Sequence, residues 1–204
     1  MPGRLFLTRP MAAVARALGA TFDLTESPRR NISPGEEVVV CTAERRLEHM
    51  RWGMIPVGRV NARGRPVMET ITNARSETVF DKSAFEGVGR AVIPADGWYE
   101  WTGKARRKQP WRINPRDGSL LFFAAIADVW NAPGGIAVPQ VAAVTCEPSA
   151  DVVDIHHRMG VILEAEDVAT WLIGAEDEAR ALMRPFPDGR LHVEEANDVD
   201  WNAP

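Results

Sequence analysis

Two short segments of the sequence carry side chains that can exchange protons near neutral pH. The first is the run Trp-Tyr-Glu-Trp at residues 98–101. On a strand, alternation puts Glu100 on the same face as Trp98. Desolvation beside apolar rings raises the pKa of a carboxyl group, which suits it to general acid or base catalysis near pH 7. The alternative is a glutamate on an edge strand that stays in water.

The second segment, residues 154–159, sets His156 beside Asp154, His157 and Arg158. An imidazole exchanges a proton near neutral pH, and a carboxylate such as that of Asp154 can orient it. A histidine held only by structural hydrogen bonds is the alternative. Zinc binding is disfavoured, because adjacent histidines do not readily face one ion and no Cys-x-x-Cys or His-x-x-x-His pair supports them. We therefore expect no metal and no cofactor.

Aromatic and basic side chains along the chain suit a single-stranded nucleic acid. Trp52 can stack on a base, and cationic side chains can hold phosphates. The alternative for Trp52 is a core anchor. The run Lys-Ala-Arg-Arg-Lys at residues 104–108 can supply cations, and a solvated hairpin tip is its alternative. Further candidate cations are Arg4, Arg75 and Arg158.

The net charge of −4 is unevenly distributed along the chain. Residues 164–204 contain eleven acidic residues and three arginines, a balance of −8. Residues 1–163 therefore contain 21 basic and 17 acidic residues, a balance of +4. A mildly basic body with an acidic C-terminal portion is compatible with a local basic groove. A solvated acidic surface at the end of the chain explains the same numbers.

Short elements must position these residues. Residues 10–18 predict a helix, with proline at its start and Gly19 after its end, and acidic residues at 164, 166 and 167 precede a second helix at 168–173. The strands lack the regular helical partners of a doubly wound sheet. We predict one α+β domain over residues 1–204, built on a curved, mostly antiparallel sheet or barrel with short peripheral helices. The predicted strands cover residues 37–41, 47–51, 91–94, 98–101, 111–113, 120–126 and 141–145.

The bulk composition predicts a cytoplasmic protein. The chain has 204 residues and 45% apolar content, enough for one sizeable core. No apolar run reaches the roughly 18 residues that span a bilayer, and the first residues lack the pattern of a secretion signal. Two cysteines make no disulfide framework. We expect a reduced, monomeric protein without membrane contact.

Six short segments together resemble the SOS-response-associated peptidase family of abasic-site processing proteins. They follow the order and rough spacing of the family over residues 1 to about 175. The segments are Gly-Arg at 3–4, Arg-Asn-Ile-Ser-Pro-Gly at 30–35, Trp-Gly-Met-Ile-Pro at 52–56, Asn-Ala-Arg-Ser-Glu-Thr at 73–78, Asp-Gly-Trp-Tyr-Glu-Trp at 96–101 and Asp-Ile-His-His-Arg-Met at 154–159.

The resemblance implies recognition of abasic sites in single-stranded DNA, often at junctions with duplex. Asn73 would hold the N-terminal residue or the sugar. Glu100 would act as acid or base on the amine and the opened sugar, and His156 would help to open the deoxyribose ring by proton transfer. The implied DNA contacts are Arg4, Asn31, Arg75 and Arg158 on phosphates, Trp52 on a base, and Thr145 lining the site.

The chain departs from the family pattern at its second residue. The family begins Met-Cys-Gly-Arg, and removal of methionine exposes a cysteine whose amine and thiol close a thiazolidine ring on the sugar aldehyde. This chain begins Met-Pro-Gly-Arg, so a stable thiazolidine is excluded. Once Met1 is removed, Pro2 offers a secondary amine that can form an iminium and promote β-elimination. His157 and Gly160 also differ, because the family usually carries Asp and Pro there.

Two other functions are compatible with the sequence. If Met1 is retained, the reactive amine is displaced, and the chain would be a non-catalytic relative that binds single-stranded DNA. The second is a thiol peptidase with Cys146 as nucleophile and His156 as base. Residues 145–147 (Thr-Cys-Glu) show nothing that would activate this thiol.

Overall fold

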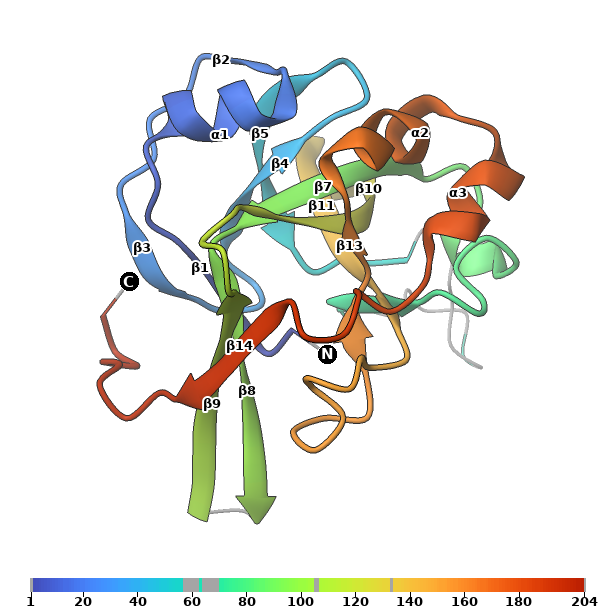
Figure 1. Cartoon of the computed structure of the whole chain (residues 1–204). Helices are drawn as coiled ribbons and strands as arrows, with labels where there is room; N and C mark the ends of the chain where they lie inside the picture. The colour runs from blue at the N-terminus through green and yellow to red at the C-terminus, as the bar shows by residue number, and fades with distance from the viewer. Residues whose placement is uncertain (1, 57–62, 64–69, 105–106, 133, 204) are drawn as a thin grey trace.

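Five strands close into a barrel at the centre of the fold (Figure 1). The structure is a computed structural model that describes residues 2–56, 63, 70–104, 107–132 and 134–203. Antiparallel pairing runs from β5 through β4, β7 and β10 to β11. A parallel pair, Gln140 of β11 with Arg51 of β5, closes the ring. The barrel strands are β4 (Glu37–Cys41), β5 (Arg46–Trp52), β7 (Gly89–Ala95), β10 (Leu121–Ala132) and β11 (Ile136–Cys146).

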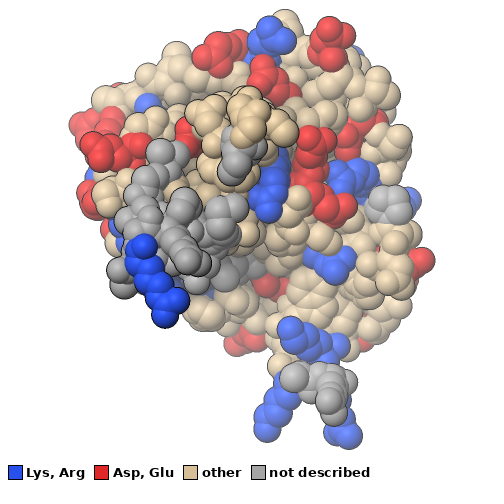
Figure 2. Space-filling model, turned by 180° about the vertical axis from the view of Figure 1, so that it is seen from behind, with Lys and Arg blue, Asp and Glu red and all other residues tan. Residues whose placement is uncertain are grey.

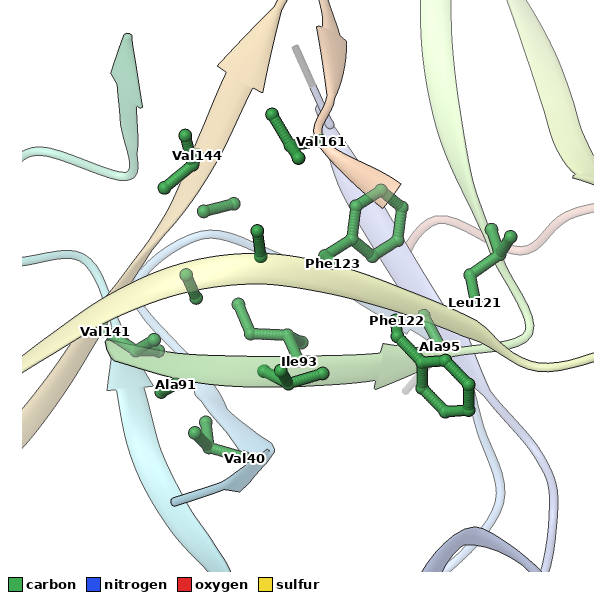
Figure 3. Packing of buried hydrophobic residues seen from close by; sticks show 14 of the residues in the cluster. Val40, Ala91, Ile93, Ala95, Leu121, Phe122, Phe123, Val141, Val144 and Val161 are labelled. Atoms are coloured by element: carbon green, nitrogen blue, oxygen red, sulfur yellow. The ribbon is translucent and has the colours of Figure 1, made fainter. Parts of the chain in front are cut away.

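Apolar side chains fill and cover the barrel. Three consecutive residues of β7, Ala91, Val92 and Ile93, are each at most 1% exposed, so both faces of this strand are buried. Figure 3 shows Val40 of β4 and Ile93 within this core. Helix α2 (Val168–Ile173) packs on β7, where Trp171 donates its indole N–H to the carbonyl of Ala91 at 2.8 Å.

A second, antiparallel sheet contains the first strand of the chain. Its order is β14 (Leu191–Glu195), β9 (Arg107–Pro115), β8 (Gly97–Lys104), β1 (Arg4–Leu7) and β3 (Arg29–Ile32). β8 follows β7 after a bend at Asp96, so the two sheets share one continuous stretch of chain. A Cβ at Gly97 would lie 2.4 Å from the carbonyl oxygen of Ile113 and 2.5 Å from Cζ of Phe6. Only glycine fits at this crossing.

The β8–β9 hairpin projects from the body of the protein. Lys104 at the end of β8 pairs with Arg107 at the start of β9. Figure 2 shows basic side chains gathered at this projection. The expectation of a hairpin over 104–108 is confirmed at its two ends, and residues 105 and 106 lie outside the described part of the chain.

The predicted fold class is confirmed, because the structure is a mostly antiparallel barrel with short helices around it. The helix expected at 10–18 is α1 (Met11–Leu18), which ends at Gly19 with φ of 58°. β10 and β11 extend beyond the predicted ranges, since their hairpin continues past the buried barrel into half-exposed and exposed residues. The remaining elements are β2 (Thr21–Phe22), β6 (Asn73–Arg75), η1 (Ser83–Phe85), β12 (Met159–Gly160), β13 (Ile162–Leu163), η2 (Ala165–Asp167) and α3 (Glu176–Leu182).

Candidate active site at the start of the chain

The start of the chain is packed inward against β8 and β12. The backbone N–H of Gly3 donates to the carbonyl of Tyr99 at 3.1 Å, which extends the β1–β8 pairing toward the N-terminus. Pro2 is buried. A Cβ at Gly160 would lie 3.2 Å from Cγ of Pro2, and a Cβ at Gly3 would lie 2.7 Å from Cζ3 of Trp101. These two glycines let residue 2 approach both strands.

Glu100 is a buried carboxyl group on β8. It is 4% exposed, on the face of β8 where Trp98 is fully buried. The other face carries Tyr99 and Trp101, which both contact the ring of Trp201. Burial raises the pKa of Glu100 to about 7, while the positive charge of the N-terminus acts in the opposite direction. The carboxyl group can therefore donate or accept a proton near neutral pH. The expected alternation and the expected direction of the pKa shift are both confirmed.

His156 is held by backbone atoms of its own loop. Its Nδ1 lies 3.0 Å from both the N–H and the carbonyl oxygen of Arg158. Burial lowers the pKa of His156, and the N-terminal charge adds to the effect. A neutral imidazole is therefore the main form at pH 7. The expectation that Asp154 orients the ring is corrected, because Asp154 is exposed and the Arg158 backbone holds Nδ1.

Arg158 is paired with the carboxylate of Glu77, which belongs to the segment Asn-Ala-Arg-Ser-Glu-Thr at 73–78. Its guanidinium binds both carboxylate oxygens of Glu77, one of them at 2.9 Å, and also donates to the carbonyl of Thr145. The hydrogen bonds from Arg158 lower the pKa of Glu77 to about 2. Arg158 is therefore fixed beside the end of β11 by an ion pair, and a phosphate would have to compete with Glu77. The sequence offered no signal for this pairing.

Strands β6 and β12 bring the remaining segments to the same end of β11. Asn73 pairs with Ala143 in parallel register, and Arg75 pairs with Thr145. On the other edge of β11, Thr145 pairs with Gly160, the residue that faces Pro2. Residues 73–75, 145 and 158–160 are thus neighbours in space, although up to 87 positions separate them in sequence.

Asn73 and Arg75 present different groups at this end of β11. The Oδ1 atom of Asn73 is buried and has no hydrogen-bond partner among the described residues, while its Nδ2 donates to the hydroxyl of Thr72 at 3.1 Å. An acceptor of this kind suits a donor brought by a ligand. Arg75 is exposed.

Two expected DNA contacts are structural instead. Trp52 is fully buried and donates its indole N–H to the carbonyl of Thr72 at 2.9 Å, so it has no free face for a base. The stacking expectation is corrected, and the core-anchor alternative holds. Thr145 is also fully buried, with its hydroxyl donating to the carbonyl of Ala74 at 3.2 Å. Thr145 therefore joins β11 to β6 rather than exposing a polar group.

Arg4 on β1 and Asn31 on the neighbouring edge strand β3 lie together. Arg4 donates to Oδ1 of Asn31 at 2.6 Å. Asn31 donates to the carbonyl oxygens of Trp201 and Ala203, each at 2.9 Å. The C-terminal segment therefore covers two of the residues expected to hold phosphates. This contact was missed from the sequence, whose only signal was a tryptophan in an acidic stretch.

The two cysteines are poor candidates for nucleophiles. Both are buried, and burial raises the pKa of Cys41 to about 11 and that of Cys146 to about 12. An activated thiol requires a lowered pKa and an accessible sulfur. Among the residues that the structure describes, no group of three or more His, Cys, Asp or Glu side chains is placed to hold a metal ion. No described helix is long and apolar enough to cross a membrane.

The fold and the site define a β-barrel protein whose N-terminal segment packs inward beside a strand that carries a buried glutamate with a raised pKa. The sequence pattern of the SOS response associated peptidase (SRAP) family matches residues 1–199. The chain belongs to this family.

Named relatives and solved structures agree with this family. Abasic site processing protein YoqW of Bacillus subtilis (strain 168) is 31% identical over 169 residues, which cover 78% of this chain and 74% of that protein. Abasic site processing protein HMCES of Gallus gallus is 33% identical over 178 residues, 74% of this chain and 53% of that protein. A structure from Bordetella bronchiseptica matches with a TM-score of 0.80 at 25% identity, over 95% of this chain and 98% of its own. One from Bacteroides thetaiotaomicron, at 21% identity, shares the fold with a TM-score of 0.84 over 96% of this chain and 92% of its own.

Proposed function

We propose that this protein processes abasic sites in single-stranded DNA through the amine of Pro2. Relatives named abasic site processing proteins support the reaction class. The observation that carries the chemistry is the position of Pro2, buried against Gly160 where the chain start runs beside Glu100 on β8. The proposal requires removal of Met1, which frees the secondary amine.

The first step forms an iminium between Pro2 and the opened sugar. With an α-amine pKa near 8, roughly a tenth of the amine is neutral at pH 7, and burial increases this share. The neutral nitrogen attacks the aldehyde carbon C1′, and a new N–C bond forms. The former carbonyl oxygen accepts protons and leaves as water. Glu100, with its pKa raised to about 7, is the proposed donor of a proton to this oxygen.

The second step breaks the DNA strand. The iminium acidifies the C–H bond at C2′, a base removes that proton, and the phosphate at C3′ leaves as the C2′–C3′ double bond forms. Water then adds to the iminium carbon, and the amine of Pro2 is released. His156, neutral at pH 7 because burial lowers its pKa, is the proposed proton carrier for opening the sugar ring. The buried Oδ1 of Asn73 is the proposed acceptor for a sugar hydroxyl or for the amine.

The proposed DNA contacts come from the two edges of the site. Arg75, exposed on β6, and Arg158 would hold phosphates on one side, and Arg4 with Asn31 would hold them on the other. The proposed partner is a single-stranded segment with an abasic site, including segments at a junction with duplex. The protein would act as a monomer.

Borohydride trapping tests this proposal. Protein whose mass shows loss of Met1 is incubated with an abasic single-stranded oligonucleotide and borohydride, which reduces an iminium to a stable amine. We expect a covalent band that maps to Pro2. The matched control is Pro2→Leu, whose bulky second residue leads cells to retain Met1 and so displaces the amine. No band from the trimmed protein, or an equal band from the control, would contradict the Pro2 mechanism.

A second variant separates the position of residue 2 from its chemistry. Pro2→Cys restores amine and thiol on one residue, so a thiazolidine can close on the same aldehyde. We expect a cross-link that survives without borohydride, whereas Pro2→Ser should give none. Tight binding to abasic DNA without any band in every variant would instead favour the non-catalytic relative.

A further inference from the structure

The C-terminal segment, residues 198–203, lies across one face of the second sheet, where it contacts residues of β9, β8, β1 and β3. In Figure 1 it runs from the end of β14 toward β3. The ring of Trp201 lies edge-on to Tyr99 with centroids 5.0 Å apart, and 5.2 Å from the ring of Trp101. The guanidinium of Arg4 lies 5.5 Å from the centroid of the Trp201 ring. Trp101 is also the side chain that faces Gly3, so the segment reaches the start of the chain.

Acceptor groups of this segment occupy donors of the body. Arg112 on β9 donates to both carboxylate oxygens of Asp198 at 2.9 Å, and Asn31 donates to the carbonyl oxygen of Trp201 at 2.9 Å. Arg4 also donates to that oxygen, at 3.3 Å. A carboxylate on an arginine, carbonyl oxygens on amide and guanidinium groups, and a flat ring among aromatic rings are the contacts that a single-stranded nucleic acid makes with its phosphates and bases.

The segment is held weakly. The side chain of Asp198 is 69% exposed, so solvent screens its ion pair with Arg112. After Ala196, which donates its N–H to the carbonyl of Pro110 at 3.0 Å, the described residues show no backbone–backbone hydrogen bond between this segment and the sheets. A cavity of about 450 Å³ lies beside it, lined by Arg30, Tyr99 and Arg112 among others. The main anchors that remain are the ring of Trp201 and the carbonyl oxygens that Asn31 binds.

We infer that residues 198–203 are a built-in competitor that occupies part of a nucleic-acid path, and that this path includes Arg112 and the Tyr99–Trp101 face. A single strand would displace the segment, pair a phosphate with Arg112 and stack a base where the ring of Trp201 lies. This inference rests on the proposed function, because Arg4 and Asn31 are its proposed phosphate contacts. It adds a contact residue, Arg112, and a mode of regulation to that site.

Removing the segment tests the inference. A variant that ends at Asn197 is compared with the full chain for binding to a fluorescent abasic oligonucleotide and to an unmodified one of the same sequence, by anisotropy at two salt concentrations. If the segment occupies the path in nine molecules of ten, its removal tightens apparent binding about tenfold. In the shortened chain, Arg112→Ala should weaken binding to both oligonucleotides and reduce the salt slope by about one.

Full-length variants guard against misfolding of the shortened chain. Trp201→Ala and Asp198→Asn each remove one anchor and should tighten binding several-fold, with the larger effect from Trp201→Ala. Glu166→Gln removes the same charge as Asp198→Asn from an exposed position of η2 and should leave binding unchanged. A peptide of residues 197–204 should compete with the oligonucleotide for the shortened chain.

The possible failures are distinguishable. If the full chain binds and forms the trapped adduct, but loss of the segment leaves binding equal or weaker, only the inference on the segment is overturned. If tightening occurs without any adduct at Pro2, the inference stands and the Pro2 chemistry is wrong. If neither chain binds either oligonucleotide, both proposals fail.

Discussion

Two glutamates of the candidate site have opposite surroundings. Glu100 on β8 is 4% exposed and lies beside buried Trp98. Glu77, on the loop after β6, has a side chain that is 51% exposed and is paired with Arg158. Burial raises the pKa of Glu100 to about 7, and hydrogen bonds from Arg158 lower that of Glu77 to about 2. The same side chain therefore has two different properties in one region.

The site therefore has two sides with different properties: a buried side around Glu100 and a charged side formed by Glu77 and Arg158. A carboxyl group removed from water changes its proton occupancy near pH 7 and can transfer protons. A carboxylate that is paired with arginine stays ionised at every pH near neutral, and it positions the cation instead of transferring protons. The buried side is therefore suited to chemistry, and the charged side to holding the loop that carries His156 and Arg158.

The largest expected effect comes from removing the titrating group of the buried side. Glu100→Gln keeps the shape but cannot transfer a proton, so formation of the trapped adduct should slow by about 100-fold to 10,000-fold. Single-turnover trapping measures the rate. Glu48→Gln, on β5 with a side chain that is 42% exposed, is the matched control and should react like the parent. An unchanged rate in Glu100→Gln would mean that another group supplies the proton.

The same substitution should change how stability depends on pH. The pKa of Glu100 is about 7 in the folded protein and near its ordinary 4.5 when unfolded, so the folded state binds more protons between these values. Stability should fall as pH rises through this window and level off above pH 7, with a cost on the order of 3 kcal/mol. Glu100→Gln should remove this fall. Urea unfolding at pH 5 and pH 8 measures the change in the free energy of unfolding between the two pH values. An equal change in the parent and in Glu100→Gln would contradict the raised pKa.

A methyl group at Gly160 should clash with the side chains packed around Pro2 on the buried side. Its Cβ would lie 2.5 Å from the ring of Phe123 and 3.2 Å from Cγ of Pro2. We expect Gly160→Ala to destabilise the protein by about 1–3 kcal/mol and to slow adduct formation, because Pro2 is pushed aside. Thermal unfolding and trapping report the two effects. Gly89→Ala is the control, since its Cβ would meet only the carbonyl oxygen of Ala127 at 3.7 Å.

The smallest effect is expected on the charged side. The pKa of Glu77 is lowered from 4.5 to about 2, so its pairing stabilises the fold above about pH 4.5 and is lost as pH falls toward 2. Because the side chain is half-exposed, the contribution is about 1 kcal/mol or less. Glu77→Gln should therefore lower stability at pH 6 and match the parent near pH 2. An effect that grows with falling pH would reverse the assignment.

Parts of this site followed from the sequence, and others did not. The desolvated glutamate followed from its aromatic neighbours, since strand alternation is a local rule. The stacking role predicted for Trp52 was wrong. The residues around a tryptophan in the sequence do not distinguish a surface ring from a core ring. The orienting group expected for His156 was also wrong, since Asp154 is exposed and the backbone of Arg158 contacts Nδ1 of His156. The pairing of Arg158 with Glu77 spans 81 positions and has no local signature.

The local sequence determined the strand and helix segments, the apolar barrel strands and the absence of a thiol at residue 2, because each depends on neighbouring residues alone. Tertiary structure decided that Pro2 is buried against Gly160, that Glu77 neutralises Arg158, and that residues 198–203 cover Arg4 and Asn31. These contacts join residues far apart in the chain. Their energies depend on burial and on the distance between charges, and neither quantity exists until the barrel has closed and the second sheet has formed beside it.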